Sequence, residues 1–255
     1  ESRFGNGEVV SVLNETGGNE IVITDILTSQ TAWFMATNSP SGEKIKELSY
    51  RYADGTKASV GSVGTMVTIR NAGTLMNVCL GDYATVDGAA RLVNGTVNSC
   101  EKAPAKVGKN VIADDFIFSS GSHVEDAAII NKCFIGQASH VGRGFSVAES
   151  VIFSNCHFEN GEGCAIFAGP FSVSHHKATL LIAGAFSFFN AGSGSNQSNH
   201  MYKTGPIQSG FLERGTSLAS GSHVLWPLHA GPFSLVMGHH ISHCDTADLP
   251  FSYLL

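Results

Sequence analysis

Residues 124–152 read VEDAAIINKCFIGQASHVGRGFSVAESVI, and the apolar residues in this stretch recur with one spacing. Three pairs stand 17 positions apart: Val124 with Val141, Ile130 with Val147, and Ile135 with Ile152. Three apolar columns with a common period predict three faces in each turn of chain, each face burying one side chain. Neighbouring turns of such a stack pair in parallel, so the residues of one column lie over each other. The stretch therefore predicts a parallel β-helix.

The columns extend in both directions from this stretch. One period earlier they hold Val107, Ala113 and Phe118, and one period later the first column holds Phe158. Further toward the N-terminus the same spacing pairs Ile69 with Val86, Leu75 with Leu92, and Leu80 with Val97. Small residues (Ser122, Ser139 and Cys156) follow the third column and suit the inside of a tight corner. Glycine and Asx residues interrupt every run, which argues against helices here.

The domain organisation follows from where the pattern holds. We predict an all-β chain in which residues 1–20 form a β-helix coil and residues 59–255 form the main parallel β-helix. Residues 21–58 carry apolar residues at helical spacing and a break at Ser39-Pro40, so we predict a small helical insertion there. Loop insertions are predicted near residues 100–106, 160–170 and 191–209, where the period is lost.

Composition excludes several functions. Only 14% of residues are charged and the net charge is −6, which makes nucleic acid a poor partner. No apolar run reaches the ~18–20 residues of a membrane span, so no membrane is expected. Six cysteines at irregular spacing contain no CxxC pair, and we expect reduced thiols in a cytoplasmic protein. The first residue is not Met, and we expect a piece of a longer chain.

Histidines recur in phase with the coils. His123, His140, His157 and His175 are spaced 17, 17 and 18 apart, and His223 and His240 are predicted to repeat the phase further on. One interpretation is a row of bases beside a groove, since imidazole titrates near working pH. The other is a stacked surface ladder without chemistry.

The candidate site centres on residues 174–177, Ser-His-His-Lys. His175, His176 and, after the polar segment, His200 are candidate catalytic bases. Lys177 and Lys203 would hold a phosphate or carboxylate of the ligand. From the polar segment, Asn196, Gln197 and Asn199 are predicted to contact the same ligand. The alternative is a loop satisfied by its own side chains.

A second histidine group, residues 239–245, has a composition typical of metal sites. Adjacent residues on a strand point to opposite faces, so His239 and His240 do not easily share an ion. No metal site is predicted.

Two resemblances add to this reading. Residues 135–144, IGQASHVGRG, resemble the aliphatic-Gly-x-x-small-x hexapeptide repeat of the hexapeptide acyltransferase superfamily, which implies a left-handed β-helix. Residues 14–18, 167–170, 174–177, 192–203 and 231–238 resemble a domain-of-unknown-function family of long hexapeptide-repeat proteins common in gut Bacteroidales. That family implies a larger parent chain and no particular activity.

Two functions remain open. The first is a transferase that moves an acyl group to a sugar or nucleotide sugar, with an acyl-CoA as the expected donor. The resemblance to hexapeptide acyltransferases implies a homotrimer for this case. The second is a non-catalytic protein that binds a carbohydrate or nucleotide sugar, consistent with the Ser-, Asn- and Gly-rich composition. No complete catalytic set decides between them.

Overall fold

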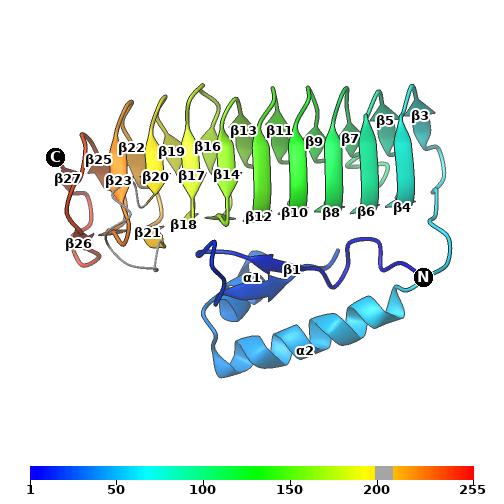
Figure 1. The fold of residues 1–255 in the computed structure, drawn as a ribbon, viewed down its shortest axis with the longest axis horizontal. Helices are drawn as coiled ribbons and strands as arrows, with labels where there is room; N and C mark the ends of the chain where they lie inside the picture. The colour runs from blue at the N-terminus through cyan, green and yellow to red at the C-terminus, as the bar shows by residue number, and fades with distance from the viewer. Residues whose placement is uncertain (199–208) are drawn as a thin grey trace.

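The computed structural model describes residues 1–198 and 209–255. The chain forms one long stack of parallel coils, with two small helices on one side of it (Figure 1). The predicted parallel β-helix with a small helical insertion is therefore confirmed.

Each coil has three faces. One face is built from short strands that pair only with each other: β3 (Thr68–Arg70), β5 (Thr85–Asp87), β7 (Lys106–Val107), β9 (His123–Val124), β11 (His140–Gly142), β13 (His157–Glu159), β16 (Val173–Ser174), β19 (Asn190–Ala191), β22 (Ser217–Leu218), β25 (Leu235–Val236) and β27 (Tyr253–Leu254). We call it the histidine face, because His123, His140 and His157 lie on it in register.

The other two faces are continuous in the first half of the stack. Long strands run across both of them: β4 (Thr74–Leu80), β6 (Arg91–Val97), β8 (Ile112–Phe118), β10 (Ile129–Ile135) and β12 (Ser146–Ile152). Each bends at a middle residue with positive φ: Asn77, Asn94, Asp115, Lys132 and Glu149. The register skips these residues, which form the corner between two faces.

In the second half of the stack the two faces separate into short strands. The face that continues the first halves of the long strands holds β14 (Glu162–Cys164), β17 (Leu180–Ile182), β20 (Asn196–Ser198) and β23 (His223–Leu225). The face that continues their second halves holds β15 (Phe167–Ala168), β18 (Gly184–Phe186), β21 (Gly210–Leu212), β24 (His229–Ala230) and β26 (Asp245–Thr246). We call the latter the helix-side face, because the helices lie against it.

The predicted columns are the core. Val124 pairs with Val141, Ile130 with Val147, and Ile135 with Ile152, and all six are buried. The corner residues Ser122, Ser139 and Cys156 are also buried. A single coil has no interior, so these side chains are removed from water only by the coils above and below.

Residues 1–20 do not form a β-helix coil, so that prediction is wrong. β1 (Val9–Ser11) instead pairs antiparallel with β2 (Glu20–Val22) outside the stack. A continuation of the stack would need parallel pairing, and this short hairpin satisfies its backbone groups locally.

Two helices follow the hairpin within residues 21–58: α1 (Ser29–Ala36) and α2 (Pro40–Gly55). Thr28 starts α1, where its side chain and that of Thr31 form a capping box. Ser39 caps α2 with Pro40 in the first turn, so the predicted break is the start of the second helix.

One predicted loop insertion is a regular coil instead. Residues 160–170 contain β14 and β15, which pair with both neighbouring coils. In the third predicted insertion, β19 and β20 belong to the stack, but each pairs with a strand 27 residues further on, so this coil is longer than the regular 17. Residues 199–208 lie outside the described part. Near 100–106 the chain does leave the strands, in a tight turn closed by Cys100 and Ala103.

The register also differs late in the chain. Leu218 lies beside Val236 rather than Leu235, and His223 bridges to His239, so His240 does not continue the predicted phase. Coil lengths change here, so a fixed period of 17 misplaces partners by one residue.

Candidate functional site

A pocket of about 570 Å³ lies between α1 and the helix-side face. Its walls come from five elements: the helix α1, which contributes Trp33, and the strands β15, β18, β21 and β24. The turns that follow β15, β18 and β21 also line the pocket. The volume is in the range of small-molecule sites. The lining residues are Ser29, Gln30, Trp33, Phe167, Gly169, Pro170, Ala185, Phe186, Ser187, Phe211, Leu212, Glu213, Arg214 and His229.

Aromatic rings form one wall of the pocket. The Trp33 ring meets Phe167 edge to face at 5.2 Å and Phe211 at 6.1 Å between ring centroids. Phe211 in turn lies 5.5 Å from the His229 ring. Trp33 keeps 38% of its surface exposed, although large aromatic side chains are usually mostly buried. An indole held in place and still open to solvent offers a flat apolar surface to a ligand.

Polar groups also line the pocket. His229 Nε2 lies 2.8 Å from Glu213 Oε1. Since a carboxylate only accepts hydrogen bonds, Nε2 is the donor in this contact, and in the neutral form of the ring Nδ1 is then an acceptor. The Arg214 guanidinium sits 4.0 Å above the Phe188 ring, which orients a cation at the pocket edge.

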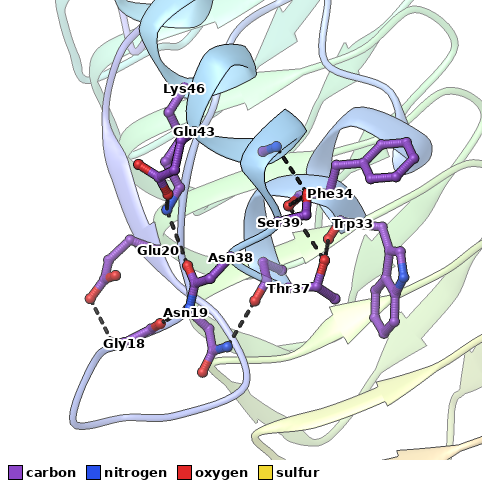
Figure 2. A network of polar contacts seen from close by, with 12 residues as sticks. Gly18, Asn19, Glu20, Trp33, Phe34, Thr37, Asn38, Ser39, Glu43 and Lys46 are labelled. Atoms are coloured by element: carbon purple, nitrogen blue, oxygen red, sulfur yellow. Dashed lines mark hydrogen bonds and ion pairs between the residues drawn. The ribbon is translucent and has the colours of Figure 1, made fainter.

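A network of hydrogen bonds holds α1 where Trp33 reaches the sheet (Figure 2). Asn19 Nδ2 donates to Ala36 O at 2.7 Å, and Asn38 Nδ2 donates to Gly18 O at 2.6 Å. Lys46 reaches Asn38 from α2 at 3.3 Å. These contacts tie the end of α1 to the hairpin and to α2. The position of Trp33 is therefore set by the whole N-terminal segment.

Two of the predicted bases, His175 and His176, lie on a different side of the molecule. His175 and His176 sit in the turn after β16, with ring centroids 4.3 Å apart, and the His175 ring is 5.9 Å from His157. His157 pairs with Val173 in the backbone, so His175 joins the histidine ladder by its ring and not by register. Lys177 is exposed in the same turn, and its backbone carbonyl accepts a hydrogen bond from the backbone N–H of Gly194.

The other predicted residues separate from this turn. Asn196 accepts a hydrogen bond from Ser198 at 2.6 Å on β20. Gln197 is fully buried and faces Gly184, so a ligand on the surface does not reach its amide. Asn199, His200 and Lys203 lie outside the described residues. None of the predicted residues in the described part lines the aromatic pocket.

The histidine face carries a second group of ionisable side chains. Glu159 is almost fully buried next to His157, His140 and Arg143. Burial by itself raises the pKa of Glu159, but the hydrogen bond from His157 and the charges of His157, Arg143 and His140 outweigh it, and the net pKa is lowered. Burial also lowers the pKa of His123, which favours its neutral form.

The pocket residues had a signal in the sequence that the fixed period hid. Phe211 pairs with His229 at a separation of 18 residues. A coil period allowed to vary by one residue would have placed Phe211 beside His229, and Glu213 close to both. Trp33 carried no such signal, because its contacts to Phe167 and Phe211 cross more than a hundred residues.

Comparison with known families decides the membership of the chain. The family model described as "Domain of unknown function (DUF4954)" matches residues 1–255. The chain belongs to this family. Among curated proteins, no sequence match is found. The DUF4954 description assigns no activity, and the pocket is the feature of the chain from which a function can be inferred.

In the described residues, no helix is long and apolar enough to cross a membrane.

Proposed function

We propose that the protein binds a carbohydrate in the pocket between α1 and the helix-side face. The observation that carries the proposal is the exposed Trp33 ring, fixed against Phe167 and Phe211 in a pocket that polar side chains also line. The apolar C–H face of a sugar ring packs on such a surface, while its hydroxyls need donors and acceptors at the edge. Gln30, Glu213 and His229 supply both kinds of group.

Arg214 extends the proposal to nucleotide sugars. Its guanidinium lines the pocket and is held over Phe188, so it presents a fixed cation to a phosphate group. A planar guanidinium binds phosphate oxygens in pairs, which makes Arg a common residue in phosphate recognition. Binding of this kind needs no bond to break, and a non-catalytic binding protein is the function that the geometry supports best.

The test is a binding screen with free sugars, disaccharides and nucleotide sugars, read by thermal shift and then by calorimetry. Trp33→Ala is expected to weaken binding by roughly 30-fold, since truncating a central aromatic contact commonly costs about 2 kcal/mol or more. Phe34→Ala is the matched control. Phe34 is the next residue on α1, is exposed, and does not line the pocket.

Equal loss of affinity in both variants would mean that α1 is merely disturbed, and unchanged affinity in Trp33→Ala would remove the pocket from consideration. A screen in which no sugar stabilises the protein would count against the proposal as a whole.

Acyl transfer is a second candidate, favoured by the contact between His229 and Glu213. A base oriented by a carboxylate takes the proton of a sugar hydroxyl as the hydroxyl oxygen attacks the thioester carbonyl, and the thiol of the donor leaves. In this proposal His229, rather than the His175, His176 or His200 of the sequence prediction, is the base. The resemblance to hexapeptide acyltransferases supports it only as an analogy of fold.

Incubation with acetyl-CoA and any sugar that binds distinguishes the two candidates. Release of free CoA that is lost in His229→Asn, with sugar binding retained, would establish transfer. The homotrimer and the cytoplasmic location stay predictions, as does the Bacteroidales origin. Light scattering of the purified chain tests the trimer directly.

A further inference from the structure

The histidine face holds a group of ligand atoms that the proposed function does not use. His140 on β11 and His157 on β13 are directly paired neighbours in adjacent coils, and Glu159 ends β13. This face is distinct from the one that carries the pocket. Pairing in register places the two imidazoles about one strand spacing apart, and their ring centroids are 4.7 Å from each other.

The three side chains converge on one point. Glu159 Oε1 lies 3.3 Å from His140 Nε2 and 3.1 Å from His157 Nε2. The three atoms all lie within 4.8 Å of one another. Ligand atoms bound to one small divalent cation at about 2.0–2.2 Å stand at similar separations. The group therefore needs little movement to surround an ion.

Neighbouring charged side chains help to hold these three residues in place. Arg143 Nη1 contacts the other carboxylate oxygen, Glu159 Oε2, at 3.1 Å, which leaves Oε1 for the imidazoles. His140 Nδ1 lies 3.6 Å from Glu125 Oε1 on its far side. At this distance the two groups form no hydrogen bond, but a small approach would let Nδ1–H donate to Glu125, and such a carboxylate fixes the tautomer whose Nε2 can bind a metal. Gly142 keeps the space open, because a Cβ there would come within 2.9 Å of His140 Nε2.

We propose that His140, His157 and Glu159 form a binding site for a divalent transition-metal ion of the Zn²⁺ type. Two imidazole nitrogens and one carboxylate oxygen are a ligand set that Zn²⁺ accepts, and neither Mg²⁺ nor Ca²⁺ prefers imidazole. The ion takes the place of the hydrogens that otherwise join the imidazole Nε2 atoms to Glu159. His157 is half exposed, so at least one position on the ion stays open to water.

An overlapping alternative uses His123, Glu125 and His140. The two groups share His140, so a single ion cannot occupy both. We favour the group with Glu159, because this carboxylate is 7% exposed and anchored by Arg143, whereas Glu125 is 35% exposed. In the favoured arrangement Glu125 supports His140 from behind instead of binding the ion.

The experiment is titration of the purified, metal-stripped full chain with Zn²⁺ by calorimetry and with Co²⁺ by visible absorption. One ion per chain is expected, and bound Co²⁺ should give the absorption of a low-coordinate site. His157→Asn and Glu159→Gln should each weaken binding by about 100-fold or more, beyond the ~10–100-fold typical of an outer-shell change. Glu125→Gln should weaken it about tenfold.

Two variants serve as controls. His239→Asn changes a histidine that stacks on His223 with ring centroids 3.9 Å apart, and it should leave the Zn²⁺ affinity unchanged. His123→Asn should also leave it nearly unchanged. Loss of binding in His123→Asn but not in His157→Asn would overturn the assignment in favour of the alternative group. Weak binding of several ions that no variant alters would overturn the site itself, and circular dichroism confirms that each variant is folded.

Discussion

At the scale of single residues, two cysteine thiols are buried in the interior of the stack and are unreactive there. Cys133 and Cys156 lie in the core, and burial raises the pKa of each to about 12. Their sulfur atoms also contact backbone carbonyls, Cys133 with Val147 O and Cys156 with Gly169 O. Only a thiolate is a good nucleophile, so these side chains are inert parts of the stack. Cys100, by contrast, is exposed in the turn outside the strands.

Thiol labelling of the native protein near pH 8 is therefore expected to be selective. Cys100 should react with a maleimide or a disulfide reagent, while Cys133 and Cys156 should stay unmodified over the same time. Mass spectrometry of peptides locates the label, and denatured protein, in which all six thiols react, is the control. Rapid modification of Cys133 in the native state would show that the stack opens locally.

The raised pKa values also predict a pH dependence of stability. In the unfolded chain Cys133 loses its proton near its ordinary value of 9.0, and in the folded chain only near 12. Between these values the unfolded state binds fewer protons, so the free energy of unfolding falls as pH rises, by at most about 1.4 kcal/mol per pH unit for one group. Cys133→Ala should have a flatter profile over the same range in urea unfolding. A profile identical to that of the unmodified protein would contradict this account.

At the scale of one strand, close packing leaves no room for added atoms. Gly210 begins β21, and a Cβ at this position would overlap the ring of Trp226 and approach Leu228 O. Trp226 is fully buried and donates from Nε1 to Ile182 O at 2.6 Å, so it cannot turn away without losing that bond. The strand that carries Phe211 and the pocket rim is thus held by the absence of a side chain.

Gly210→Ala is expected to lower the free energy of unfolding by about 1–3 kcal/mol, the usual cost of overpacking a core. Because Phe211 follows Gly210 on β21, its displacement should also weaken the binding of any ligand in the pocket. Gly55→Ala is the matched control at the end of α2, where a Cβ meets nothing within 4 Å. Alanine is the better helix former by up to ~1 kcal/mol, so this variant should be neutral or more stable. Chemical denaturation measures both, and an unaffected Gly210→Ala would mean that Trp226 can move.

The spacing of residues in successive strands explains why the faces of the stack were predicted from the sequence and the pocket was not. Val124, Ile130 and Ile135 repeat at a strict 17 residues, since each coil there has corners of equal length. From Val147 to Gly163 the step is 16, and from Gly163 to Leu181 it is 18. One residue added at a corner moves every later side chain relative to the fixed period. A regular stack can therefore be predicted from one fixed period, whereas a site in irregular coils needs a period that varies, and its contact with a distant helix leaves no signal in the sequence.

At the scale of the whole molecule, the N-terminal segment lies along the outside of the stack (Figure 1), where it covers an apolar surface. Side chains that point outward from the helix-side face, among them Phe134, Val151 and Phe153, are buried against it. They form a second apolar cluster with Ile21, Met35 and other residues of the hairpin and α1. Without this cover the face would expose a contiguous apolar patch, of the kind that drives association.

Phe153→Asp in the full chain should detach the N-terminal segment from the stack, while the stack itself stays folded. Phe153 is 3% exposed, and a carboxylate at this place would be buried among apolar side chains, with no cation to pair with it among Phe134, Phe167 and Val151. The expected result is rapid proteolysis within residues 1–67, larger species in light scattering, and a retained β-sheet signal in circular dichroism. Ile129→Asp is the control, because Ile129 is 45% exposed on another face and should tolerate the charge.

The two proposed sites should respond differently to Phe153→Asp. Sugar binding, which needs Trp33 on α1, is lost in Phe153→Asp, while Zn²⁺ binding on the histidine face persists. Loss of both would mean that the segment and the stack fold as one cooperative unit.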